Sequence, residues 1–141
     1  MNSEFTIAVH SLVLLAYRSD HMATSEMLAH NVCTHPARVR KVMSSLRKAG
    51  YVKTKEGIGG GYQLSCEPSA VTLDEVYRTT SIGSMKPGWC SGDVEQECMI
   101  ACNMAEVMDG IFNEAEQQLL DYLKKVTVAD VLNRVRESSN R

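Results

Sequence analysis

The stretch at residues 36–65 reads PARVRKVMSSLRKAGYVKTKEGIGGGYQLS and combines the signals of a helix with those of a β-hairpin. Its first part predicts a helix, because apolar residues recur every three or four positions, Pro36 suits a first helical turn and Gly50 suits a helix end. Its second part predicts a β-hairpin, because strand-like runs at 51–55 and 62–65 flank a turn rich in glycine. A basic helix followed directly by such a hairpin indicates a winged helix-turn-helix.

Charge is distributed unevenly along the chain, whose formal net charge is −2. From Arg38 to Lys55 there are seven Lys or Arg and no acid, whereas from Asp93 to Asp121 there are eight acids and no base. This polarity indicates that one part of the chain faces an anion while the other keeps away from it. A basic helix face alone is often only a solvated surface, so the hairpin after it is what favours DNA binding.

We expect DNA contacts from this third helix of the chain and from the hairpin, which is called the wing below. Arg and Lys of the helix suit phosphates and base edges in the major groove, and the glycines let the wing backbone approach DNA closely. Thr34 is also expected to be the N-cap of the helix. The expected DNA-contacting residues are Thr34, Arg38, Arg40, Lys41, Ser44, Lys55, Gly59, Gly60, Gly61 and Tyr62.

Outside this stretch the sequence predicts helices at 5–17, 24–32, 72–80, 98–125 and 127–135. The segment 81–97 has no periodicity and is expected to be flexible. The fold class is therefore mainly α with a small β-wing. We expect three regions: a winged helix-turn-helix DNA-binding domain at 1–80, a flexible cysteine-containing sensor loop at 81–97, and a dimerisation helix with a C-terminal helix at 98–141.

The predicted helix at 98–125 has an apolar surface too wide for one packing partner. Two lines of apolar residues lie side by side on it, so we expect one to face the chain's own domain and the other a second copy of the chain. The expected dimer-interface residues are Met104, Met108, Ile111, Ala115 and Leu119.

Four segments carry a resemblance to a known family: RKAGYV at 47–52, GIGGGYQL at 57–64, TLDEVY at 72–77 and VTVADV at 126–131. With them, nearly the whole chain resembles the Rrf2 family of bacterial winged-helix transcription regulators, which includes IscR, NsrR and CymR. The resemblance implies a homodimer joined by crossed long helices, with one winged domain on each half-site of a partly palindromic operator. Glu56 departs from the family, because relatives often carry an Arg there that reaches the minor groove.

The five cysteines point to thiol chemistry. The apolar run at 5–17 is broken by polar residues and predicts neither a secretion signal nor a membrane span, so we expect a cytoplasmic chain without structural disulfides. Cys33 comes just before the expected N-cap of the third helix, where the positive helix end would stabilise a thiolate; a buried packing role is the alternative. We expect oxidation to link Cys33 to Cys90 or Cys98, whereas Cys66 is expected to be structural.

An iron-sulfur cluster is the alternative to thiol oxidation, with Cys90, Cys98 and Cys102 as the candidate ligands. Family members that hold such a cluster have three cysteines separated by about five residues each, whereas here seven and three residues intervene. Cys98 and Cys102 are also four apart on a predicted helix, a spacing that arises from core packing. We therefore expect no bound cofactor and keep the cluster as the alternative.

Taken together, these patterns predict a DNA-binding transcriptional regulator, and more specifically a repressor. It would act as a homodimer on a double-stranded operator and would be controlled by cysteine oxidation. A winged-helix adaptor that binds proteins instead of DNA is a further alternative. An enzyme is not expected, because no His, Ser or carboxylate constellation accompanies the cysteines.

Overall fold

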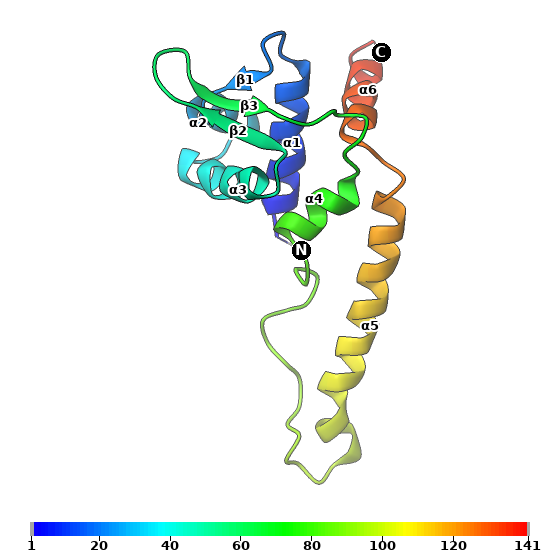
Figure 1. Ribbon diagram of the computed structural model, residues 1–141. Helices are drawn as coiled ribbons and strands as arrows, with labels where there is room; N and C mark the ends of the chain where they lie inside the picture. Colours follow the sequence, from blue (N-terminus) through cyan, green and yellow to red (C-terminus); the bar gives the residue numbers. More distant parts are fainter. Residues whose placement is uncertain (1, 141) are drawn as a thin grey trace.

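The computed structural model describes residues 2–140, which form a mainly helical chain with a small antiparallel sheet (Figure 1). The predicted fold class is confirmed. The elements in chain order are α1 (Glu4–Tyr17), β1 (Met22–Ala23), α2 (Ser25–Val32), α3 (Pro36–Lys48), β2 (Val52–Lys55), β3 (Gly61–Leu64), α4 (Leu73–Thr80), α5 (Met99–Leu123) and α6 (Val128–Ser139).

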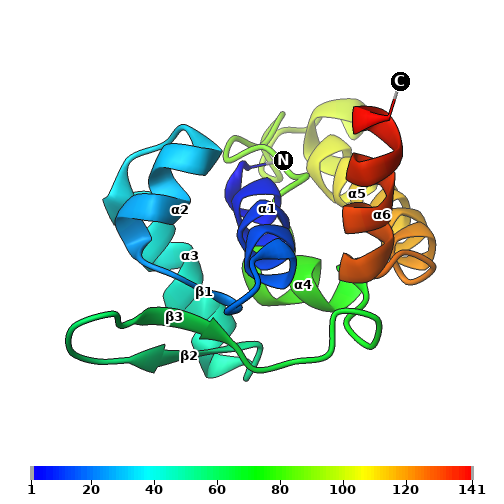
Figure 2. The same cartoon turned by 90° about the horizontal axis from the view of Figure 1, so that it is seen from above.

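The wing is the antiparallel pair β2–β3, in which Val52 pairs with Leu64 and Lys55 with Gly61. A third strand, β1, pairs with the other edge of β3, so the strand order is β1-β3-β2. The sequence did not indicate β1, because a two-residue strand is too short for an alternating pattern. Figure 2 shows the wing reaching sideways beyond α3.

The core lies among α1, α3 and α4, which pack against one another. Leu12 of α1, Val39 and Leu46 of α3 and Tyr77 of α4 are completely buried. This burial fixes which side of α3 faces outward, because its apolar residues at helical spacing all point to the core.

Helix α5 projects away from this body, and only its last turn enters the core, through Leu120 and Leu123 (Figure 1). The chain then returns through α6, which packs beside α1. Thr127 and Asp130 form a complete capping box at the start of α6, as their spacing predicts. None of the helices within residues 2–140 combines the length and the apolar composition of a membrane span.

The start of α3 differs from the expectation. The N-cap is His35, whose Nδ1 accepts a hydrogen bond from the Ala37 N–H at 3.0 Å. Thr34 instead belongs to the end of α2, where its N–H donates to the Ala29 carbonyl at 3.0 Å. The expectation was wrong because Thr is a common N-cap, whereas the imidazole here takes that role one residue later.

Candidate nucleic-acid interface and thiol segment

The exposed side of α3 is basic. Val39, Val42, Met43 and Leu46 are buried, whereas the basic side chains on the opposite side are exposed to solvent. The exposed basic residues of this helix are Arg38, Arg40, Lys41, Arg47 and Lys48. Ser44, also expected at DNA, is half-buried between the two sides. The helix can therefore offer a row of cations to a polyanion while its other face is held by the core.

These cations do not all have the same surroundings. Lys41 forms an ion pair with Glu4 of α1, with 2.9 Å between Nζ and Oε1, and Arg38 donates a hydrogen bond to the Ser3 hydroxyl. Within residues 2–140, Arg40 takes part in no ion pair. Sequence reasoning missed this division, because the first turn of α1 meets α3 only in the folded chain.

The wing places Lys55 and Ile58 in solvent, and Ile58 at its tip is fully exposed. Gly59 has a φ of +77°, which favours glycine. Gly60 and Gly61 have a structural reason to be glycine, since a Cβ there would collide with the backbone of Lys55 and of Ala23 respectively. Tyr62 is half-buried against the core, so part of its ring stabilises the wing.

Cys33 lies one residue farther from the N-cap of α3 than expected, because that N-cap is His35. It is the C-cap of α2, exposed, with φ 64° and ψ 52°, and its Sγ lies 3.6 Å from the His30 carbonyl oxygen. The C-terminal end of α2 carries the negative end of its helix dipole. His35, rather than Thr34, is the N-cap of α3. Cys33 is therefore not the residue directly before the N-cap of α3, which was the basis for expecting a thiolate there.

Cys98 has the surroundings that were expected for Cys33. It is the exposed N-cap of α5, and the nearby backbone N–H groups of Ala101 and Ile100 lower the pKa of its thiol. In contrast, burial raises the pKa of the Cys66 thiol, with a smaller contribution from Glu67. Cys98 is therefore the thiol that the structure favours as thiolate. The sequence predicted that the helix begins at residue 98, so Cys98 was expected inside the helix rather than as its N-cap.

The segment between α4 and α5 contains no helix or strand, as predicted, but it contacts α5 along its length. The Gly83 N–H donates to Glu116 at 2.7 Å, Lys86 forms an ion pair with Asp109 at 2.7 Å, and the Asp93 N–H donates to the Ala101 carbonyl at 2.9 Å. A movement of α5 would therefore also move this segment and its cysteines.

The candidate cluster ligands do not converge. Cys90 and Cys98 are exposed, whereas Cys102 is half-buried and its Sγ lies 3.3 Å from the Asn103 side-chain nitrogen and 3.5 Å from the Met99 carbonyl oxygen. Within residues 2–140 no three Cys, His, Asp or Glu side chains are grouped to hold a metal ion. Thiolates suit iron-sulfur chemistry, but Cys90, Cys98 and Cys102 are not gathered around one point in the described residues.

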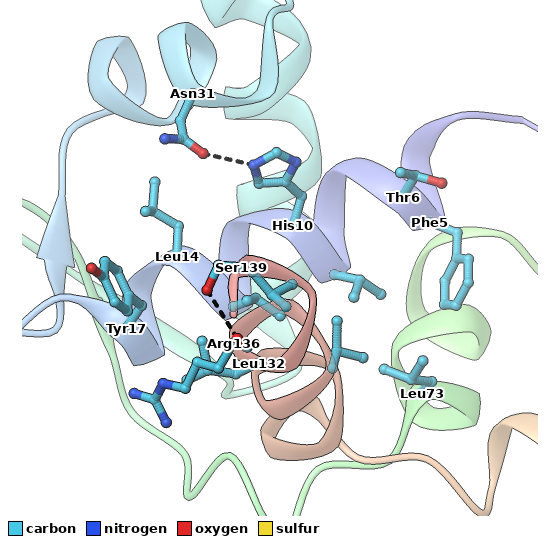
Figure 3. A pocket seen from close by; sticks show the side chains of 14 residues that line it. Phe5, Thr6, His10, Leu14, Tyr17, Asn31, Leu73, Leu132, Arg136 and Ser139 are labelled. Carbon is cyan, nitrogen blue, oxygen red and sulfur yellow. Dashed lines mark hydrogen bonds between the residues drawn. The ribbon is translucent and has the colours of Figure 1, made fainter. Parts of the chain in front are cut away.

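A second candidate surface is an open apolar groove of about 750 Å³ between α1 and α6 (Figure 3). Phe5, Val9 and Val13 line it from α1, and Val131 and Val135 line it from α6. At its edges lie the Arg136 side chain and a pair formed by His10 and Asn31, whose Nε2 and Oδ1 atoms are 2.7 Å apart.

The expected dimer residues of α5 fall into two groups. Met108 and Ile111 are exposed, with 37% and 51% of their surfaces accessible, and Val107 beside them is 55% exposed. Met104, Ala115 and Leu119 are half-buried within the single chain, and Leu119 packs against its core. The exposed apolar side of α5 therefore includes Val107 beside the expected dimer residues Met108 and Ile111.

Comparison with known proteins gives one family. The sequence model of the Rrf2 family, described as "Iron-dependent Transcriptional regulator", matches residues 1–134. YwnA of Bacillus subtilis, named as an HTH-type transcriptional regulator, is 26% identical over 133 residues, which cover 94% of this chain and 97% of that protein. The HTH-type transcriptional regulator NsrR of Bacillus subtilis is 28% identical over 123 residues, covering 86% and 81%.

The fold has a counterpart among solved structures. The crystal structure of a transcriptional regulator from Lactobacillus plantarum aligns with a TM-score of 0.79 and 26% sequence identity, and the alignment covers 100% of both chains. The likeness extends over α5 and α6 as well as the winged domain.

Proposed function

The chain belongs to the Rrf2 family of DNA-binding transcriptional regulators and is not an enzyme, and from this premise we propose that it is a homodimeric repressor controlled by thiol oxidation. The observation that carries the DNA-binding part is the row of exposed cations on α3, opposite a face that the core holds fixed. Each winged domain would place α3 in the major groove and the wing along the backbone.

Arg40 is the best candidate for a base contact. It is exposed one turn into α3, and it forms no ion pair within residues 2–140, in contrast to Lys41. Arg40→Ala is expected to weaken operator binding by about 1–3 kcal/mol, the cost of losing one bidentate base contact. The measurement is fluorescence anisotropy with DNA from upstream of the gene. Arg78→Ala is the matched control, because Arg78 is an exposed residue of α4 outside α3 and the wing.

The same binding experiment also distinguishes a DNA-binding regulator from the alternative, an adaptor that binds proteins instead of DNA. Unchanged affinity for Arg40→Ala, Arg38→Ala and Lys41→Ala would rule out α3 as the DNA-reading helix. A chain that binds no DNA from its own upstream region, at low salt and in reduced form, would favour the adaptor.

Dimerisation would cover surfaces that one chain leaves exposed to water. One of these surfaces is the exposed apolar side of α5, with Met108 and Ile111. The other is the apolar groove between α1 and α6. Acidic residues flank the exposed side of α5, and Arg136 stands at the rim of the groove. The two surfaces therefore suit each other in polarity and in charge.

Thiol control would begin at Cys98, whose thiol has a lowered pKa. The thiolate attacks a peroxide, which releases water or an alcohol and leaves a sulfenic acid; a second thiol then displaces water and forms a disulfide. Cys33 remains the proposed second thiol. It lies in the winged domain, whereas Cys98 lies at the far end of α5 (Figure 1), so the bond would join two subunits of the dimer.

Non-reducing gels after mild peroxide treatment test this step. The wild type should give a crosslinked dimer that reductant reverses, with loss of operator binding, and both Cys33→Ser and Cys98→Ser should abolish the crosslink. A Cys33→Ser variant that responds as the wild type does would place the sensor among Cys90, Cys98 and Cys102. Visible absorption of the protein purified without oxygen, with sulfide and iron analysis, would then decide whether a cluster is bound.

A further inference from the structure

The first turn of α1 joins the two parts of the molecule that regulation has to connect. On one side it contacts basic side chains of α3. On the other side it contacts the end of α4, from which the cysteine-containing segment and α5 follow. Glu4 begins this turn, and Asn2 and the N-cap Ser3 lead into it.

On the α3 side, the Glu4 carboxylate pairs with Lys41 at 2.9 Å and the Ser3 hydroxyl accepts from Arg38. The Glu4 side chain is only 27% exposed, whereas that of Lys41 is 75% exposed. A DNA phosphate can therefore reach Lys41, but drawing the ammonium away would leave the half-buried Glu4 carboxylate without its partner.

On the α4 side, the Asn2 side-chain oxygen accepts from the Glu4 N–H at 3.1 Å and from the Ser81 hydroxyl at 3.2 Å. Ser81 is buried and is the C-cap of α4. One amide oxygen thus fixes the backbone of Glu4 to the end of α4.

Helix α5 is also connected to α4 and to the residues that follow it. Glu116 accepts from the Tyr77 hydroxyl at 2.8 Å and from the Gly83 N–H at 2.7 Å. The Tyr77 ring in turn meets the Phe5 ring of α1 edge to face, with 5.5 Å between centroids. A movement of α5 relative to α4 would therefore disturb the contacts that hold α4 against the start of α1.

We propose that Glu4 is a positioning residue that competes with DNA phosphate for Lys41, and that Ser81 and Glu116 hold it in place. This inference rests on the proposed DNA binding and adds a restraint to it: the arrangement described is the weaker-binding one. Movement of α5 and its preceding segment away from α4 releases the first turn of α1, and Lys41 and Arg38 then become available to phosphates.

The test is operator affinity as a function of salt concentration, for the full-length reduced protein. Glu4→Gln keeps the shape of the side chain and removes its charge. Operator binding by this variant should be about two- to fivefold tighter at low salt, the range of an exposed ion pair. The slope of log affinity against log salt should steepen by about 0.9, as for one added phosphate contact.

A double-mutant comparison separates competition from a general charge effect. In a Lys41→Ala background, Glu4→Gln should give no gain, whereas an equal gain there would overturn the proposal. Glu75→Gln is the matched control, because Glu75 is an exposed acid of α4 that forms no ion pair within residues 2–140. A control variant that gains as much as Glu4→Gln, with the same change in salt slope, would also overturn it.

Ser81→Ala tests the connection to α4 without touching α3. It should give a smaller gain in the same direction, which again disappears with Lys41→Ala. Unchanged affinity of Ser81→Ala would overturn the connection, and weaker binding of Glu4→Gln with unaltered thermal unfolding would overturn the competition. Absence of DNA binding by the wild type would instead be a failure of the proposed function itself.

Discussion

The winged domain and helix α5 differ in how much of their apolar surface one chain can bury. In the winged domain, Leu12, Val39 and Leu46 have no accessible surface, whereas Ile111 of α5 is 51% exposed and Ile100 is 61% exposed. Both regions have apolar residues at helical spacing, but the apolar surface of the second is wide enough to predict a further packing partner. The first pattern is satisfied within the chain, whereas the second leaves apolar side chains in water, which supports the proposed dimer.

The largest expected effect follows from placing a charge on the exposed side of α5. Ile111→Asp should convert a micromolar solution from dimer to monomer, because burying an unpaired carboxylate in an apolar interface is very unfavourable. Sedimentation velocity measures the change. Gln118→Asp, an exposed position of the same helix, is the control and should stay dimeric. A wild type that sediments only as monomer at this concentration would remove the contrast between the two regions.

A core substitution tests the other side of the comparison. Leu46→Ala should lower the free energy of unfolding by about 2–5 kcal/mol, because it leaves a cavity in a fully buried site. Urea unfolding followed by circular dichroism measures this loss. Val107→Ala should lower the free energy of unfolding far less in the monomeric Ile111→Asp background, because the Val107 side chain is about half exposed in the single chain. Equal costs for the two substitutions would contradict the division into a buried and an exposed region.

Much of the winged domain could be predicted because its signals are local. Helix α3 follows from apolar spacing with Pro36 and Gly50, and the wing follows from strand-like runs around glycines. The roles of individual side chains could not be predicted in the same way. The pairing of Lys41 with Glu4 depends on how α1 packs against α3, and the cap at Cys98 depends on where α5 begins to within one residue.

The cysteines of the two regions should react differently. The pKa of Cys98 is lowered by neighbouring backbone N–H groups, whereas the pKa of Cys66 is raised mainly by burial. Alkylation by iodoacetamide, followed by mass spectrometry as pH is raised, should therefore label Cys98 at lower pH than Cys66. Labelling in the reverse order would contradict the assignment of Cys98 as the reactive thiol.

The smallest expected effect concerns the α6 cap. Hydrogen bonds from Thr127 hold the pKa of the Asp130 carboxyl below its ordinary value, so folding favours the ionised form. Its stabilisation is present above the unfolded-state pKa and is lost as pH falls through the folded-state value. The difference in melting temperature between wild type and Asp130→Asn should therefore be constant near neutral pH and shrink in acid. A difference that grows on acidification would contradict the capping box.

The most direct test of the central claim is the number of chains that bind one operator, and how tightly they bind. Sedimentation of labelled operator DNA with increasing protein should show two chains per operator binding cooperatively. Ile111→Asp, with an intact winged domain by circular dichroism, should bind it no better than unrelated DNA. Binding of one chain per operator, with equal affinity for wild type and Ile111→Asp, would contradict the account of a DNA-reading winged domain that acts only as a pair joined through α5.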